Sequence, residues 1–286
     1  TVTSTSRILH KIGGTTGSIN LMNKHRVLSM MVDYPDIAEE LIPKKLLDKL
    51  ASKNQVRDWM GVGVIYGDAG MVKAAKKAIK KELSANCQIL MFINESRLRF
   101  LEWVVRSIPQ RIRPNILSRV DTMRKALDNF SGMPSDVALP LCWWRNKRTY
   151  VKGADPAEHR CGLIWYSPLI PAKKDIVRKY VDTTRRICEK HKIEPLITLT
   201  SISPTCFDST VPLLFDQEDP KRVEDAHRCY RELIEENKKL GVIPYRYPIS
   251  AMDAIVDADQ SSWRLVKTIK SAIDTNNILS PGRYCP

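Results

Sequence analysis

Apolar residues recur along the chain with two periods, and each period predicts a different kind of element. Alternation of apolar and polar residues, or a short apolar run, predicts strands over residues 26–32, 58–66, 89–93, 161–166, 196–202 and 211–215. Apolar residues spaced three or four apart predict helices over residues 35–50, 69–83, 173–191, 220–239 and 263–273. Residues 95–130 are also predicted to be helical, with breaks at Pro109 and Pro114.

Strands and helices follow one another in both halves of the chain, but no stretch of sequence repeats. Gly67 and Asp68 form a turn that is expected to cap the helix at 69–83. This order of elements predicts an α+β fold, an antiparallel sheet flanked by helices on one side.

The same pattern divides the chain into three regions. Residues 1–25 are rich in Ser, Thr and Gly without clear periodicity, and predict a linker or an ill-defined N-terminal segment. The glycines at 13–17 could cradle a phosphate, but they lack the lysine of a P-loop, so a flexible linker is the better interpretation. Residues 26–260 are expected to form one α+β domain, and 261–286 a C-terminal segment that leaves it.

The amino-acid composition of the chain limits the classes of protein to which it can belong. A chain of 286 residues with 43% hydrophobic residues can bury a real core. It has no apolar stretch long enough to span a membrane and no visible signal peptide. Because it begins at Thr1 rather than Met, we expect a fragment or a processed product.

The cysteines and histidines do not indicate a metal site. Seven cysteines occur without a CxxC pair, and the five histidines lack metal-ligand spacing. Reduced thiols scattered through a core favour a cytoplasmic protein.

The formal net charge of +14 is compatible with nucleic acid, an anionic membrane surface or an acidic protein as a partner. The densest basic cluster consists of five lysines on the predicted helix at 69–83: Lys73, Lys76, Lys77, Lys80 and Lys81. Aromatic residues of the kind that stack on bases are not interleaved with these lysines. A solvated helix face is therefore favoured, and nucleic acid is not.

Two short motifs place a cation on a stiff backbone. In the first, Ser280, Pro281 and Gly282 form a turn directly before Arg283. In the second, Tyr245 and Arg246 lie between two prolines. A guanidinium held in this way can meet a phenolate or another anion, although each motif taken alone is also compatible with an ordinary surface turn.

The stretch 276–283 resembles the C-terminal signature of the vanillyl-alcohol oxidase and 4-cresol methylhydroxylase family of flavoenzymes. Further matches occur in the order found in that family, and the resemblance is specific from about residue 59 to the end. They lie at residues 65–67, 131–134, 144–145, 165–168, 215–220, 230–233 and 245–246.

This resemblance implies the C-terminal half of such an enzyme, with the substrate (cap) domain and a segment returning to a flavin-binding domain not present in this chain. It implies FAD as the cofactor, bound largely by that other domain or by another chain. It also implies that Tyr245 and Arg246 bind the phenolic oxygen, and that Arg283 faces the flavin. The reaction implied is oxidation of a 4-alkylphenol or aromatic alcohol by hydride transfer to the flavin. A cytochrome and a homodimer partner are the further candidate partners.

The sequence also departs from the family pattern. The usual covalent tethers of FAD, a Tyr or a His, align with Cys142 and Leu163. A thioether at Cys142 is chemically conceivable, but a buried free thiol is favoured. The paired histidines of the family become Asp208 and Ser209, where Asp208 can serve as a base or as a turn residue. These departures and the charge leave a second hypothesis, a non-catalytic basic scaffold or binding subunit derived from the family.

Overall fold

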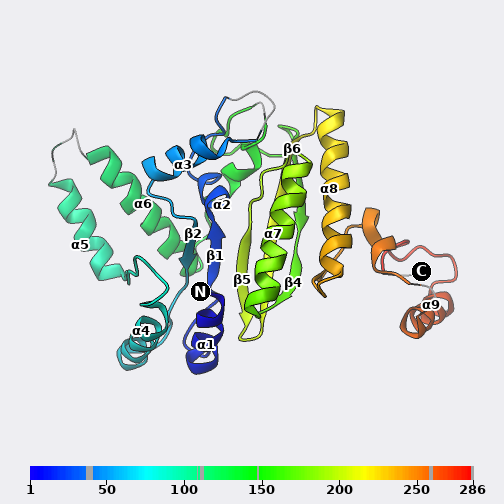
Figure 1. Cartoon of the computed structure of the whole chain (residues 1–286), viewed down its shortest axis with the longest axis horizontal. Coiled ribbons are helices and arrows are strands. Elements are labelled where there is room, and N and C mark those ends of the chain that lie inside the picture. The colour runs from blue at the N-terminus through cyan, green and yellow to red at the C-terminus, as the bar shows by residue number, and fades with distance from the viewer. Residues whose placement is uncertain (37–40, 108, 110–112, 147, 258–259, 285–286) are drawn as a thin grey trace.

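The computed structural model describes residues 1–36, 41–107, 109, 113–146, 148–257 and 260–284. Within them, a seven-stranded antiparallel sheet is flanked by helices (Figure 1). The prediction of an α+β fold with an antiparallel sheet is confirmed.

The strands are β1 (Asn20–Asn23), β2 (Trp59–Val62), β3 (Cys161–Tyr166), β4 (Pro168–Pro171), β5 (Thr198–Ser203), β6 (Cys206–Asp216) and β7 (Ile243–Pro244). The α-helices are α1 (Val2–Ile12), α2 (Lys24–Leu28), α3 (Lys44–Lys53), α4 (Ala69–Leu83), α5 (Glu95–Arg106), α6 (Arg113–Phe130), α7 (Lys174–Lys190), α8 (Pro220–Lys238) and α9 (Ser261–Ile273). Two 3-10 helices are η1 (Leu139–Trp143) and η2 (Ile249–Ala254).

The longest strand, β6, organises the sheet. The strand order is β2-β1-β5-β6-β4-β7, and β3 pairs with the second half of β6. Asp208 of β6 lies opposite Thr200 of β5 on one side and Leu169 of β4 on the other. Further along, Pro212 lies opposite Trp165 of β3. Since paired residues point to the same face, these registers decide which side chains share each face of the sheet.

One face of the sheet is buried against α7 and α8, which lie in front of it in Figure 1. This side of β6 carries Phe207, Val211, Leu213 and Phe215. Two buried phenols tie the helices to the strands. Tyr180 of α7 donates to Ser209 Oγ at 2.8 Å, and Tyr166 of β3 donates to the Leu233 carbonyl of α8 at 3.1 Å.

The opposite face is covered only at one end. There a second cluster packs α2, α3 and η1 on the sheet, with Leu28, Leu141 and Trp144 around Leu214 of β6. Beyond this cluster, toward the start of β6, that face stays partly open.

Most of the predicted elements are found close to their expected positions. The helix at 69–83 is confirmed as α4, and Asp68 caps it by accepting from the Met71 amide at 2.9 Å. The expected break between 95 and 130 is also found, since α5 ends at Arg106 and α6 begins at Arg113. Of the predicted helix at 35–50, residues 37–40 lie outside the described residues, and α3 begins only after Pro43.

The strand predicted at 26–32 is wrong. The strand lies earlier, at Asn20–Asn23, and the chain then enters α2. Asn23 decides this change, because its side chain accepts from the Arg26 amide at 3.0 Å and so caps the helix. The short apolar run was compatible with either element, and Val27 and Leu28 are buried as helical residues.

Residues 1–25 are folded, which corrects the expectation of a linker. They contain α1, β1 and the start of α2, and Ile8 of α1 is buried. The glycine-rich stretch at 13–17 joins the structure through a bridge between Thr16 and Ile65 rather than forming a free loop.

The strand predicted at 89–93 is also wrong. These residues form a loop between α4 and α5. Without a partner strand, Ile89 and Met91 remain 63% exposed each.

Gly162 of β3 provides a test of the packing on the helix-covered face. A Cβ at this position would lie against the ring of Phe215 and 2.6 Å from its carbonyl oxygen. We expect Gly162→Ala to destabilise the protein by about 2 kcal/mol, because the crowded neighbour is partly backbone. The thermal midpoint should fall by roughly 5 °C.

The matched control is Gly14→Ala, because Gly14 is exposed and a Cβ there meets nothing within 4 Å. Calorimetry should show little change for this variant. Equal midpoints for the two variants would contradict the described pairing of β3 and β6.

Candidate functional site

The uncovered part of the sheet carries the first group of candidate residues. We call it the open face. It is defined by the side chains that the strand registers place opposite α7 and α8, namely Trp165, Leu169, Thr200, Asp208 and Ile243. Trp165 is 44% exposed and Ile243 43%, so the surface is largely apolar and accessible. An apolar surface with few polar groups is typical of a binding site for an organic ligand.

Asp208 lies in the middle of the open face. Its neighbours on β6, Phe207 and Ser209, point into the core, so its carboxylate points the other way. Oδ1 is buried and has no hydrogen-bond partner among the described residues. Burial raises the pKa of the Asp208 carboxyl above its ordinary value, and the charge of Arg246 opposes part of that rise. A half-buried carboxylate with one unsatisfied oxygen is well suited to bind a donor or accept a proton.

Tyr245 and Arg246 are placed by the short edge strand β7. Pro244 pairs with Pro168 of β4, and the Tyr245 amide donates to the Ser167 carbonyl at 3.3 Å. Both side chains are exposed, and the Arg246 guanidinium lies over the Tyr245 ring at 5.2 Å from its centroid. Ile243 of β7 pairs with Leu169, and Leu169 lies opposite Asp208, so the three sequence-predicted residues come from neighbouring parts of the sheet. The charge of Arg246 acts on the Asp208 carboxyl.

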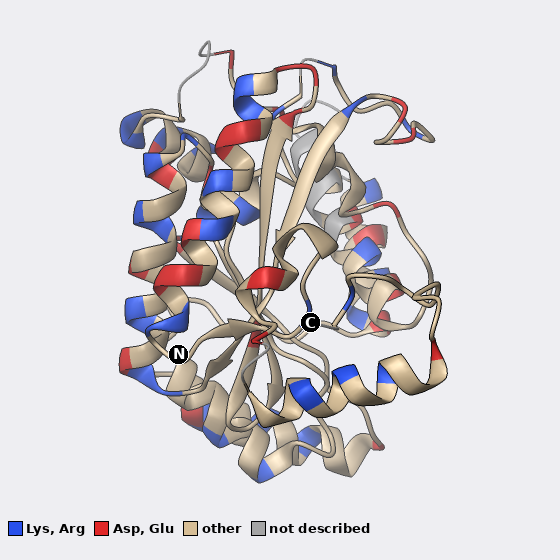
Figure 2. Cartoon of the chain, turned by 90° about the vertical axis from the view of Figure 1, so that its right-hand side faces the viewer, with Lys and Arg blue, Asp and Glu red and all other residues tan. Residues whose placement is uncertain are grey.

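The C-terminal turn docks beside this group. Figure 2 shows the C-terminal segment folding back from α9 toward the sheet. Asp274 shapes the turn by accepting from the amides of Ile278 and Leu279, each at 2.9 Å. Tyr284 attaches it, because its hydroxyl accepts from the Tyr247 amide at 3.0 Å. This bond joins the turn to the segment that carries Arg246, and the side chain of Arg283, the residue before Tyr284, is exposed.

Cys142 lies apart from the other predicted residues. It is on η1, where the charge of Arg26 and the thiol of Cys161 act on it. Burial raises the pKa of the Cys142 thiol, and Arg26 offsets only part of this. The thiol is therefore protonated near neutral pH, which fits a free thiol rather than a nucleophile.

Arg26, beside Cys142, was not identified in the sequence. It is almost fully buried, and its Nε donates to Thr198 Oγ1 at 3.3 Å. Burial lowers the pKa of Arg26 to about 10. Sequence reasoning missed this residue because it had assigned the segment to a strand.

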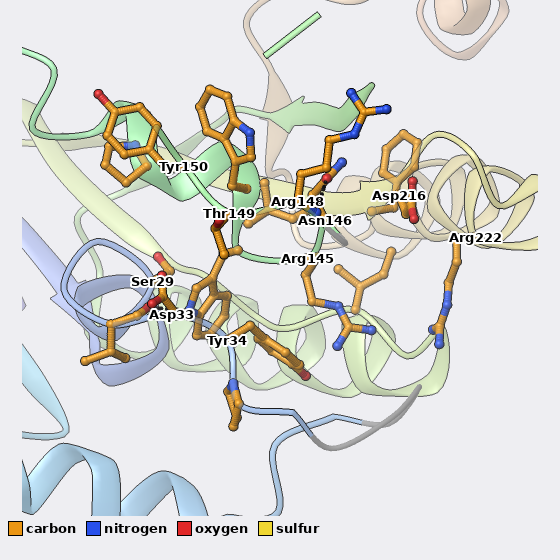
Figure 3. A pocket seen from close by; sticks show the side chains of 18 of the residues that line it. Ser29, Asp33, Tyr34, Arg145, Asn146, Arg148, Thr149, Tyr150, Asp216 and Arg222 are labelled. Atoms are coloured by element: carbon orange, nitrogen blue, oxygen red, sulfur yellow. Dashed lines mark hydrogen bonds between the residues drawn. The ribbon is translucent and has the colours of Figure 1, made fainter. Parts of the chain in front are cut away.

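A cavity of about 620 Å³ lies at the other end of β6 (Figure 3). Tyr34, Trp144, Arg145, Asp216 and Arg222 are among the residues that line it. The Arg145 guanidinium stacks over the Tyr34 ring at 4.5 Å, and the Tyr34 hydroxyl donates to Glu194 at 2.8 Å. Since a strand rises about 3.3 Å per residue, Asp216 is roughly 26 Å from Asp208 along β6. The cavity and the Asp208 group are therefore two separate regions.

Among the described residues, no group of three His, Cys, Asp or Glu side chains could hold a metal ion. No helix in the same part of the chain is long and apolar enough to cross a membrane.

Comparison of sequences relates the chain to known proteins, although no protein-family model matches it. It is 30% identical over 291 residues to the 1'-carboxy-chondrochloren decarboxylase of Chondromyces crocatus, which covers 99% of this chain and 53% of that protein. It is 27% identical over 123 residues to the flavoprotein subunit of 4-cresol dehydrogenase (hydroxylating) from Pseudomonas putida, over 43% of this chain and 23% of that subunit. The chain thus spans about half the length of the first of these curated relatives.

Comparison with solved structures agrees with the comparison of sequences. The fold matches p-cresol methylhydroxylase with substrate bound at a TM-score of 0.74 and 17% identity, over 99% of this chain and 50% of that one. It matches the 4-ethylphenol oxidase of Gulosibacter chungangensis at a TM-score of 0.74 and 16% identity, over 99% and 51% of the two chains. The resemblance of this chain to the C-terminal half of the vanillyl-alcohol oxidase and 4-cresol methylhydroxylase family of FAD-dependent oxidoreductases is therefore confirmed over its whole length.

Proposed function

We propose that the protein to which this chain contributes oxidises a 4-substituted phenol with FAD, and that the open face forms the substrate side of the active site. The observation that carries this proposal is the grouping of Asp208, Tyr245 and Arg246 on an accessible apolar surface beside the C-terminal turn. A phenol needs an apolar wall for its ring and a cation for its oxygen, and the group offers both.

The open face also fits a flavin nearby. A planar, mostly apolar ring system with an anionic edge can lie against Trp165 and Leu169 while Arg246 or Arg283 faces that edge. Arg246 and Arg283 are the residues of this chain that would hold the cofactor. Bound FAD would supply the hydride acceptor.

The part of the protein that binds the rest of FAD needs a docking surface, and α9 supplies one. Leu265, Ile269 and Ile273 are 61%, 52% and 73% exposed and follow one another at intervals of four residues. This stripe lies along one side of the helix without a partner among the described residues. We assign it to contact with the FAD-binding domain or chain.

Each residue of the group has a separate role in this proposal. Arg246 is permanently charged, so it stabilises the phenolic oxygen as an anion. Tyr245 donates a hydrogen bond to the same oxygen. Ionisation of the phenol weakens a C–H bond of its substituent. The bond is on the carbon that is attached to the ring at the position para to the oxygen. Asp208 accepts the proton that the phenolic hydroxyl loses on ionisation, and its raised pKa brings it closer to the range in which a base works near neutral pH.

A second candidate reaction is an oxidation coupled to loss of CO₂. It is favoured by the relative named as a decarboxylase, which aligns with 99% of the chain. A substrate with a carboxylate on the carbon attached to the ring would lose CO₂ from that carbon as its electron pair passes to the flavin. The same cation group would still hold the phenolic oxygen.

The first prediction for this site concerns Arg246. In the complete protein, anaerobic addition of a 4-alkylphenol, or of its analogue carrying the carboxylate, should bleach the flavin absorbance. Arg246→Ala should slow bleaching at least a hundredfold, because the anionic oxygen loses its cation. Stopped-flow absorbance measures the rate, and released CO₂ distinguishes the two substrates.

Arg178→Ala is the matched control, since Arg178 is exposed on α7 at the covered side of the sheet. It should bleach at the normal rate. A complete protein that is colourless after purification would support the non-catalytic scaffold instead. Normal bleaching in Arg246→Ala would refute the assigned role.

The second prediction concerns Asp208 and pH. The folded state raises the pKa of Asp208, so it binds the proton more tightly than the unfolded state does. Stability from this group is present at low pH and declines as pH rises above the ordinary value near 4. At pH 7, Asp208→Asn should therefore stabilise the fold by about 1 kcal/mol, or roughly 2 °C in midpoint, while lowering activity.

The rise in thermal midpoint that Asp208→Asn causes should become smaller as pH falls toward 4. Asp182→Asn, on the exposed side of α7, should show neither effect. A loss of stability in Asp208→Asn at pH 7 would show that the carboxylate has a stabilising partner in the complete protein.

A further inference from the structure

A second apolar surface lies at the other end of the molecule from α9. Figure 1 shows α4 and α5 at one end of the long axis and α9 at the other. The apolar side chains there belong to the loop between α4 and α5 and to α5 itself. They are Ile89 (63% exposed), Leu90 (37%), Met91 (63%), Ile93 (37%), Phe100 (62%), Leu101 (38%) and Trp103 (65%).

Those on α5 are exposed because the opposite side of this helix packs against α6. Leu98 and Val105 are buried against α6, together with Val120. Phe100 and Trp103, one turn apart, lie with ring centroids 6.0 Å from each other. Large apolar side chains that gather on a protein surface mark a place that contacts something else.

Basic residues border the apolar ones. Lys76 and Lys80 of α4 place their ammonium groups over the ring of Phe92, at 5.7 and 5.9 Å from its centroid. Residues 69–107 contain eight basic and three acidic residues, a net charge of +5. The three acidic residues are already neutralised within the chain, Glu82 by Arg7 and Lys11, and Glu95 and Glu102 by Arg124.

We propose that this basic-apolar patch, the seven apolar residues together with the lysines of α4, binds the surface of an anionic lipid membrane. Protruding Trp, Phe and Ile side chains insert into the headgroup region, and lysines beside them attract anionic lipid headgroups. A second copy of the chain is disfavoured, because it would bring two faces of the same charge together. The proposal concerns binding to the surface, since none of the described helices could span a membrane.

Vesicle sedimentation tests the proposal with the complete protein. Vesicles of phosphatidylcholine with about 30% phosphatidylserine should bind it, and vesicles of phosphatidylcholine alone should bind at least tenfold more weakly, because each basic residue near an anionic surface contributes about fivefold. Phe100→Ser/Trp103→Ser should reduce binding at least tenfold. Lys76→Gln/Lys80→Gln should reduce it about 25-fold.

Lys174→Gln/Lys179→Gln is the matched charge control on α7, and it should bind normally. Thermal midpoints and flavin content confirm that each variant is folded. Failure to bind either vesicle, or equal binding to both, would overturn the proposal. So would a concentration-dependent dimer, seen by sedimentation velocity and abolished by Phe100→Ser/Trp103→Ser, because the patch would then serve a second copy.

Discussion

The fold depends on β6, whose side chains point alternately to the two faces of the sheet. Its alternate residues bury one face of the sheet under α7 and α8, and this contact supplies the largest core cluster of the described residues. The other face is covered only where Leu214 meets α2, α3 and η1. Because a strand presents consecutive residues to opposite faces, the packing that buries Phe207 and Ser209 necessarily places Asp208 on the open side.

The open face keeps a polar group that costs the fold stability. Asp208 keeps a buried oxygen without a partner, and the cation that acts on it is exposed. A folded protein retains such a group mainly where function requires it. The edge strand β7 and the C-terminal turn converge at this place, since Tyr284 hydrogen-bonds to the Tyr247 amide. Residues 37 positions apart in the sequence are thus joined next to Arg246.

The two unpartnered apolar surfaces differ in charge and position. The stripe on α9 is near the C-terminal turn that we assign to the cofactor-facing side, whereas the patch around α5 lies at the far end and is bordered by the α4 lysines. An apolar surface bordered by cations favours an anionic counterpart. The proposed docking surface for the flavin-binding part and the proposed lipid-binding surface therefore lie at opposite ends of the chain.

The fold class, most of the helices and the family resemblance could be predicted from the sequence. Long amphipathic helices such as α7 and α8 can be recognised in the sequence because their apolar positions repeat over four or five turns. The motifs around Tyr245 and Arg283 can be recognised because each is a short run of consecutive residues. Long-range contacts and a local cap set the conformation of the short apolar segments. Residues 26–28 lie in α2, which Asn23 caps, and 29–32 form the turn that follows it. Residues 89–93 form an exposed loop for lack of a partner strand. A run of five to seven apolar residues has no period of its own, so long-range contacts choose its conformation. The same is true of the position of Asp208 relative to Arg246, which depends on a strand register that no local pattern specifies.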